Sequence, residues 1–185
     1  MNRKLIGAVA ATALAASAAL TLGSASPATA DSIGVKDADD VRHGVDLRSV
    51  RVVNSDRNVR IVLTHTNLRR DPRSGAGGAV YIDTDPADRG PELVFAGGYF
   101  EGTDYQLLHT EGFGVKKWGK VVDGFHILRL DYDREQTRMR MSRKAVGNVD
   151  DVRVAVRVAG DRRDGTSVVD WLGEPRSYTP WVEQG

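Results

Sequence analysis

Apolar and polar residues alternate with a period of two along much of the chain after residue 44. The clearest run is residues 151–159 (DVRVAVRVA), where four valines fall on one side and Arg153 and Arg157 on the other. Because successive side chains of a β-strand point to opposite faces, this pattern predicts a strand with one buried face. Residues 45–53 and 59–66 alternate in the same way around a five-residue polar turn, which predicts a β-hairpin.

Short segments of the same kind continue to residue 172, separated by stretches rich in glycine and proline. Helical spacing is confined to residues 142–147, where Ser142 and Gly147 suit the start and end of a single turn. About nine short strands with at most one helical turn predict an all-β fold, an antiparallel, jelly-roll-like β-sandwich. The further predicted strands are residues 79–83, 92–96, 104–110, 113–122, 124–132, 136–141 and 167–172.

The first thirty residues have the composition of a secretory signal peptide. A basic start is followed by an apolar run and by a small-x-small cleavage site: Arg3-Lys4, residues 5–22 and Ala28-Thr29-Ala30. Cleavage before Asp31 predicts a secreted, extracellular protein that has no membrane segment afterwards. An uncleaved membrane anchor is the alternative interpretation of the same run.

What remains after residue 30 is long enough for one domain. Strand patterning begins at residue 45 and ends at residue 172. We therefore divide the chain into a signal peptide (1–30), a lead-in (31–44), a β-sandwich domain (45–172) and a C-terminal tail (173–185) that lies along the surface.

Charge and cysteine content narrow the classes of function. Without the two basic residues of the signal, 24 of the 26 Lys and Arg remain against 25 Asp and Glu, a net charge of −1. Such a balance argues against a nucleic-acid-binding protein, so we interpret the outward arginines as the solvent face of the strands; a stripe that binds a polyanion is the alternative. The absence of cysteine excludes disulfides, a thiol nucleophile and Cys-ligated zinc. We expect a monomer.

One acidic loop follows directly after the predicted strand 79–83. Its carboxylates come at nearly alternate positions: Asp83, Asp85, Asp88 and Glu92. Calcium prefers several oxygens collected from one loop, so this spacing predicts a calcium site, although no cofactor is certain from the sequence. A β-turn in which aspartates cap backbone N–H groups is the alternative.

Aromatic residues in or beside predicted strands are the candidates for ligand binding. Planar rings stack on the C–H faces of sugars, and neighbouring polar groups take the hydroxyls. The candidates are Asp104, Tyr105, Trp118 and Trp171, although the same rings are typical of a sandwich core. Trp118 is the best of them, since its neighbours Lys116, Lys117, Gly119 and Lys120 suggest exposure.

Several short motifs in order resemble the β-sandwich superfamily of family 9 carbohydrate-binding modules and DOMON-like domains. They are GGAVYIDTD, GTDYQL, DGFHI, a Ser-x-x-x-x-Gly turn and a final VDW, and they cover most of residues 40–172. The resemblance implies a β-sandwich that binds a sugar, haem or calcium and is commonly non-catalytic. We expect this module to stand alone, without the catalytic domain to which members of the superfamily are usually attached. The chain is also similar to small actinobacterial secreted proteins.

These observations predict a secreted, non-catalytic binding domain that recognises a carbohydrate or cell-envelope component. No nucleophile elbow, P-loop, dinucleotide-binding or S-x-x-K motif is present, and the histidines have no metal-binding spacing. A protein-interaction or inhibitor domain that uses glycine-rich loops is the first alternative. A small hydrolase whose site is assembled from distant residues is the second.

Overall fold

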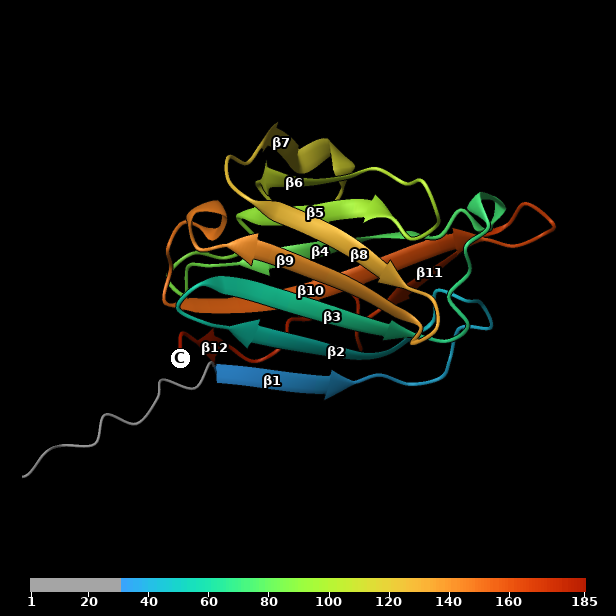
Figure 1. Ribbon diagram of the computed structural model, residues 1–185, viewed down its shortest axis with the longest axis horizontal. Coiled ribbons are helices and arrows are strands. Elements are labelled where there is room, and N and C mark those ends of the chain that lie inside the picture. The colour runs from blue at the N-terminus through green and yellow to red at the C-terminus, as the bar shows by residue number, and fades with distance from the viewer. Residues whose placement is uncertain (1–30) are drawn as a thin grey trace, which may run out of the picture.

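The computed structural model describes residues 31–185; the predicted signal peptide lies outside the described residues. Two antiparallel β-sheets pack face to face, and the only helical segments in the described chain are three single 3₁₀ turns. Figure 1 shows the two layers, with the five-stranded sheet nearer the viewer. The predicted all-β, antiparallel sandwich is confirmed. In residues 31–185 no helix is long and apolar enough to cross a membrane.

The five-stranded sheet combines the N-terminal strands with a later hairpin. Its order is β1 (Asp31–Lys36), β2 (Leu47–Asn54), β3 (Asn58–His65), β9 (Gln136–Ser142) and β8 (His126–Asp131). The predicted β2–β3 hairpin is confirmed, and its register joins Val50 to Leu63 and Val52 to Ile61. The pairing of β3 with β9 connects residues that are more than seventy positions apart in the sequence.

The seven-stranded sheet contains a meander of four successive strands and the longest strand of the described chain, Asp151–Asp161. Its order is β11 (Ser167–Trp171), β10 (Asp151–Asp161), β4 (Gly77–Asp83), β5 (Leu93–Gly98), β6 (Tyr105–Thr110) and β7 (Trp118–Val121), and β12 (Val182–Glu183) also pairs with β10. The 3₁₀ turns are η1 (Pro72–Ser74), η2 (Val115–Lys117) and η3 (Lys144–Val146). The last lies within the segment 142–147 where one helical turn was predicted.

The core lies between the sheets and is made by the inward positions of the alternating strands. The four valines of β10, at 152, 154, 156 and 158, are fully buried, while Arg153 and Arg157 point to the other face. His65 of β3 is also buried; its ring hydrogen-bonds the Val45 carbonyl at 3.2 Å and the Thr137 hydroxyl at 3.1 Å. Burial lowers the pKa of His65 to about 4, so the imidazole is neutral at pH 7.

Both ends of the described segment 31–185 belong to the sandwich, which corrects the assignment of residues 31–44 as a lead-in and 173–185 as a surface tail. The edge strand β1 pairs with β2 at six successive positions. In the C-terminal segment Val182 is buried, and the buried Thr179 hydroxyl accepts a hydrogen bond from the Val154 N–H at 3.1 Å. The sequence signal was weak here because an edge strand needs few apolar residues, and β1 has only Ile33 and Val35.

Candidate functional site

The outer face of the seven-stranded sheet carries one transverse row in which large and small side chains are unequally placed. Across this row Trp171 is opposite Arg157, Arg157 is opposite Ala79, and Ala79 is opposite Ala96. Because Ala79 and Ala96 have only methyl groups, the middle of this face is recessed, whereas the large indole of Trp171 projects at one end of the row. The next row is lower still, because Gly77 is opposite Gly98.

Aromatic rings surround this low region. The Tyr81 ring, from β4, lies nearly parallel to the Trp171 ring, with centroids 6.3 Å apart and 14° between the planes. Phe113 contacts both, at centroid distances of 4.8 Å from Tyr81 and 6.0 Å from Trp171. Trp118 packs against the same small cluster from the first position of β7. Tyr81, Phe113, Trp118 and Trp171 thus come from β4, β7, β11 and one loop.

That loop, residues 111–117, is held against the sheet by hydrogen bonds. The Gly114 N–H donates to the Tyr81 hydroxyl at 3.0 Å, and the Thr110 hydroxyl lies 2.7 Å from the Gly112 carbonyl and 3.1 Å from the Lys117 carbonyl. Gly112 and Gly114 have φ values of +142° and +98°, which residues with a Cβ rarely adopt. The loop therefore presents Phe113 in a fixed position.

The result is a hollow of about 520 Å³, here called the aromatic hollow. Its floor is formed by the glycines and alanines of β4 and β5, and its sides by Tyr81, Phe113, Trp118 and Trp171. Arg157 and Arg176 supply charged donors at its border. Within the described residues its lining includes no carboxylate and no histidine, the groups used most often for general acid–base chemistry.

Two of the four predicted ligand-binding residues meet in this hollow and two lie elsewhere. Trp118 and Trp171 line it together. Tyr105 points to the opposite side of its sheet, where its ring stacks on Phe95 at 5.8 Å and meets His126 edge-on at 6.3 Å. Asp104 is exposed beside Tyr105. Tyr105 and Asp104 are thus not part of the aromatic hollow, because Tyr105 faces the main core.

The predicted calcium loop does not gather its carboxylates around one point. Asp83 is fully buried, and its Oδ2 forms an ion pair with Arg153 at 2.6 Å. Glu92 accepts hydrogen bonds from the N–H and hydroxyl of Thr84 at 2.7 and 3.0 Å. Asp85 and Asp88 each accept a local backbone N–H, from Ala87 and Arg89. These are the caps and turns of the alternative interpretation.

Arg153 explains both the burial of Asp83 and the position of the third tryptophan. Its guanidinium lies 4.5 Å from the Tyr178 ring centroid and 4.4 Å from that of Trp181. The same guanidinium donates from Nε and Nη2 to a single oxygen, Oδ2 of Asp83, at 2.9 and 2.6 Å. A cation between two rings that is also paired with a carboxylate is a stable arrangement, and it fixes the C-terminal segment over β10. Trp181 therefore has a packing role outside the hollow.

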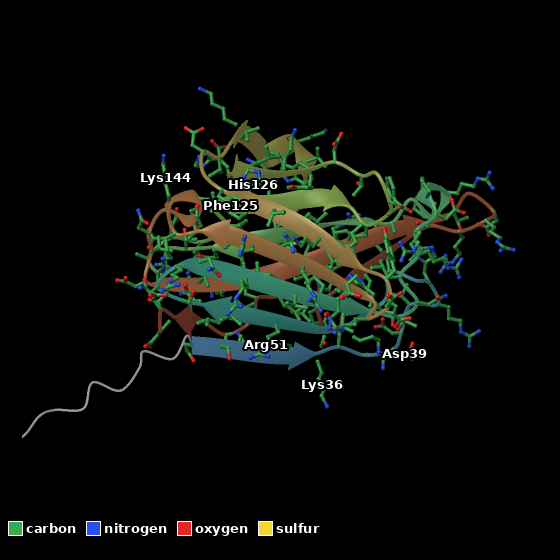
Figure 2. All side chains as sticks on the ribbon, in the orientation of Figure 1. Lys36, Asp39, Arg51, Phe125, His126 and Lys144 are labelled. Carbon is green, nitrogen blue, oxygen red and sulfur yellow. The ribbon has the colours of Figure 1, made fainter. Side chains whose placement is uncertain are left out.

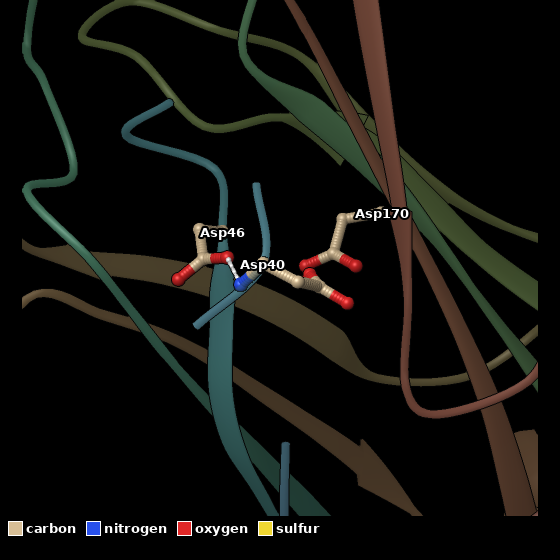
Figure 3. Close-up of side chains that lie close together, drawn as sticks. All are labelled: Asp40, Asp46 and Asp170. Carbon is tan, nitrogen blue, oxygen red and sulfur yellow. Dashed lines mark hydrogen bonds between the residues drawn. The ribbon is translucent and has the colours of Figure 1, made fainter. Parts of the chain in front are cut away.

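A different acidic group does converge. One carboxylate oxygen from each of Asp40, Asp46 and Asp170 lies within 4.8 Å of the others. Figure 3 shows these three side chains close together. Among residues 31–185 this is the only set of three acidic or histidine side chains that meets this distance. Asp46 is held by the N–H groups of Asp40 and Val41, and Asp170 accepts the Leu47 N–H at 2.7 Å.

This crowding changes the proton affinity of one member. Burial raises the pKa of Asp170 to about 6, and the negative charges of Asp37 and Asp40 act in the same direction. The hydrogen bond from Leu47 acts against them. Near neutral pH Asp170 is ionised and lowers the free energy of unfolding, whereas in mild acid Asp170 is protonated and this loss of stability disappears.

No protein-family model matches the chain, and the search of curated proteins finds no match.

Several residues of the hollow were missed at the sequence level. Tyr81 and Phe113 lie in segments that were assigned to strands, and nothing in a strand pattern says that the buried Tyr81 ring and the partly exposed Phe113 ring line one hollow. The sequence did contain a signal for the hollow: two successive strands have small residues at outward positions. These residues are Gly77 and Ala79 of β4 and Ala96 and Gly98 of β5. Such a pair of strands has no side chains to fill its outer face.

Proposed function

We propose that the protein is a secreted, non-catalytic binding domain that recognises a carbohydrate or cell-envelope component through the aromatic hollow. The single observation that carries the proposal is the meeting of Trp118 and Trp171 with Tyr81 and Phe113 over a floor of glycine and alanine. A pyranose ring presents axial C–H groups that stack on such rings, and a flat floor admits a polymer rather than a single small molecule.

The polar groups of the hollow agree with this ligand class. Arg157 and Arg176 carry N–H donors at its border. Hydroxyl groups of a sugar can accept hydrogen bonds from these guanidinium groups. The absence of carboxylate and histidine from the described lining favours binding over hydrolysis.

Rigid rings are a further support. Phe113 is fixed by the hydrogen-bonded loop 111–117, and Tyr81 and Trp171 are stacked nearly parallel. A preorganised surface loses little conformational entropy when a ligand binds.

The test is binding of the purified protein to a panel of neutral polysaccharides and wall fragments, by affinity electrophoresis and calorimetry. We expect one of β-glucan, xylan, mannan, chitin oligomers or peptidoglycan fragments to bind and to change the tryptophan emission, since two of the three tryptophans line the hollow. Trp171→Ala is expected to weaken this binding at least tenfold, about 1.4 kcal/mol.

A matched control removes an aromatic ring from elsewhere. Phe125 is 51% exposed on the loop before β8, near Arg140 of the other sheet, so Phe125→Ala is expected to leave sugar binding unchanged. Thermal unfolding of both variants shows whether either has lost its fold. If the folded wild-type protein binds nothing in the panel, or if Phe125→Ala weakens binding as much as Trp171→Ala, the proposal is wrong.

A further inference from the structure

The outer face of the five-stranded sheet has a charge pattern that appears only when the strands are in register. Its middle row runs from Arg51 of β2 through Val62 to Arg138 and Arg129. The neighbouring row contains Arg60 and Arg140. We call Arg51, Arg60, Arg129, Arg138 and Arg140 the arginine face; Figure 2, which is viewed onto this sheet, labels Arg51, with Lys36 at the lower edge.

Two pairs of like charges lie directly opposite each other on this face. Arg60 is the cross-strand partner of Arg140, and Arg138 is the cross-strand partner of Arg129. Like charges at such positions lower the stability of a sheet. A surface that only needed to be soluble would alternate the signs across the strands, as ordinary solvent faces do, so these pairs are a cost that folding does not require.

Few negative groups offset this charge. Arg138 forms an ion pair with Asp131 at 3.2 Å, at the edge of the sheet. In residues 31–185 no carboxylate forms an ion pair with Arg51, Arg60, Arg129 or Arg140. The protein without its first thirty residues carries a net charge of −1, so the positive charge is concentrated here rather than spread over the molecule.

The face is also hollowed and partly prearranged. A depression of about 690 Å³ is lined by all five arginines together with neutral polar groups, Ser49, Thr64 and Gln136. Gln136 Oε1 accepts from both Nε and Nη2 of Arg138, at 3.0 and 2.7 Å, which fixes the orientation of that guanidinium. Guanidinium forks recognise carboxylates and sulfates bidentately, and the neutral groups are suited to hydroxyls.

We propose that the arginine face is a second binding site, and that it binds an anionic polysaccharide whose carboxylate or sulfate groups pair with these arginines. Strands lie about 4.8 Å apart, so a chain that crosses the sheet along the middle row meets Arg51, Arg138 and Arg129 in turn, with Val62 between the first two. This site is separate from the aromatic hollow, lies on the opposite sheet and does not depend on the function proposed for that hollow.

Other polyanions fit this surface less well. Bases of single-stranded nucleic acid need aromatic platforms, and no aromatic side chain lines the described depression. An anionic membrane needs exposed apolar side chains to insert, whereas the apolar residues here, Val62, Ile127 and Met139, are partly or fully buried between the arginines. The hydroxyl groups of Ser49 and Thr64, which are cross-strand partners in this depression, favour a glycan.

The experiment measures binding of the purified protein in 150 mM NaCl to polygalacturonate, to dextran sulfate and to unmodified dextran of similar size. The first two probes distinguish carboxylate from sulfate, and the third measures binding without charge. We expect binding to at least one charged polymer and none to dextran. The double variant Arg60→Gln/Arg140→Gln is expected to weaken it at least tenfold and to reduce the slope of log K against log salt by about one to two.

Stability provides a readout that separates lost binding from lost folding. Because the double variant removes a like-charge cross-strand pair, its melting temperature is expected to be unchanged or higher. The matched control Arg162→Gln/Arg163→Gln removes the same charge from the exposed β10–β11 turn and is expected to bind like wild type. Trp171→Ala is also expected to retain this binding, which keeps the two sites distinguishable.

The following results would overturn the proposal: no preference for charged polymer over dextran, equal loss in the Arg162/Arg163 control, or tighter binding to an oligothymidylate or to phosphatidylglycerol vesicles than to either anionic polysaccharide. Tighter binding to the oligothymidylate would assign the face to nucleic acid, and tighter binding to the vesicles would assign it to a membrane.

Discussion

The two outer faces of the sandwich come from the same kind of strand and yet differ in what stands at their outward positions. In the five-stranded sheet these positions carry long cationic side chains, and nothing in the described chain covers them. In the seven-stranded sheet they carry glycine, alanine and aromatic rings, partly covered by the loop 111–117 and the C-terminal segment. The inward positions of both sheets are apolar and mostly valine, leucine and isoleucine, with Met139 and Met141 added in the five-stranded sheet and Phe95 in the seven-stranded one.

This difference shows which positions were free to serve a ligand. The inward side chains of both sheets fill one close-packed core and therefore have little freedom. The outward side chains are not packed in the core, so an outward residue that lowers the stability of the fold needs an explanation other than folding. Opposed arginines on one face and open aromatic rings on the other are both unfavourable for folding, and each fits a different ligand chemistry.

The largest effect we expect contrasts a glycine from each sheet. A Cβ at Gly78 of β4 would lie 2.8 Å from Tyr99 Cζ and 2.9 Å from the Arg157 carbonyl oxygen, and the Tyr99 ring is fully buried. Gly78→Ala is expected to lower the free energy of unfolding by about 3 kcal/mol. Gly34→Ala of β1 has no atom within 4 Å of the added Cβ and is expected to change it by less than about 0.5 kcal/mol. Urea unfolding of both variants measures the difference, and equal effects would contradict it.

The second prediction contrasts two buried titratable groups, one from each sheet, whose effects on stability have opposite signs. His65 has a lowered pKa of about 4, so the unfolded chain binds more protons and stability falls as the pH drops from about 6.5 to 4. Asp170 has a raised pKa of about 6, so the folded chain binds more protons and stability falls as the pH rises from about 4 to 6. Each accounts for about 2–3 kcal/mol.

These opposed effects are separated by two variants in urea unfolding at pH 7 and pH 4. Asp170→Asn is expected to lose about 2 kcal/mol more than wild type between pH 7 and pH 4, since only the His65 effect remains. His65→Gln is expected to lose about 3 kcal/mol less than wild type over the same interval. Parallel pH profiles for all three proteins would show that these groups do not titrate as their burial indicates.

A smaller effect is expected from filling the aromatic hollow without removing a ring. Ala96 lies on its floor, and Ala96→Leu places a larger side chain where a sugar would stack, so we expect neutral-polysaccharide binding to weaken about tenfold, or 1.4 kcal/mol. Gln106→Leu adds the same side chain to the next strand in the same row, outside the hollow, as the matched control. Binding to the anionic polymer is expected to be unchanged in both. Affinity electrophoresis measures both ligands.

The smallest effect concerns the loop that carries Phe113. Tyr81→Phe removes the hydroxyl that accepts from the Gly114 N–H, and we expect the free energy of unfolding to fall by about 1 kcal/mol. Amide hydrogen exchange in residues 111–117 is expected to become faster. Tyr105→Phe, whose ring packs on Phe95, removes a hydroxyl from a comparable ring and is expected to leave this exchange rate unchanged, whereas equal acceleration would mean a general loosening.

The strands were predictable where alternation was strong and both neighbours were strands of the core. Residues 151–159 and the hairpin 45–66 were assigned correctly because their period of two is a property of the local backbone. The strand β1 was missed because only two apolar residues mark it, and the two-residue β12 because its burial depends on contacts with β10 and β2. Edge pairing is a tertiary event that leaves little local signal.

The candidate site was predictable only in part. Trp118 and Trp171 both line the aromatic hollow, whereas Tyr105, chosen with them, faces the core, and ligand binding by the two tryptophans stays a prediction. Alternation shows which residues of a strand share a face. Which of the two faces is exposed depends on where the partner sheet packs. For the acidic loop, spacing suggested a shared cation, but the backbone turns used each carboxylate locally.

By itself the sequence determined that the chain forms short antiparallel strands with one face buried, since alternation acts through the backbone geometry of each strand. It also determined the local turns. Only the tertiary structure decided which strands are neighbours, and therefore that Arg60 lies opposite Arg140 and that Trp171 lies in the row of Ala79. Those neighbours are joined by hydrogen bonds between residues far apart in the chain, so no local pattern encodes them.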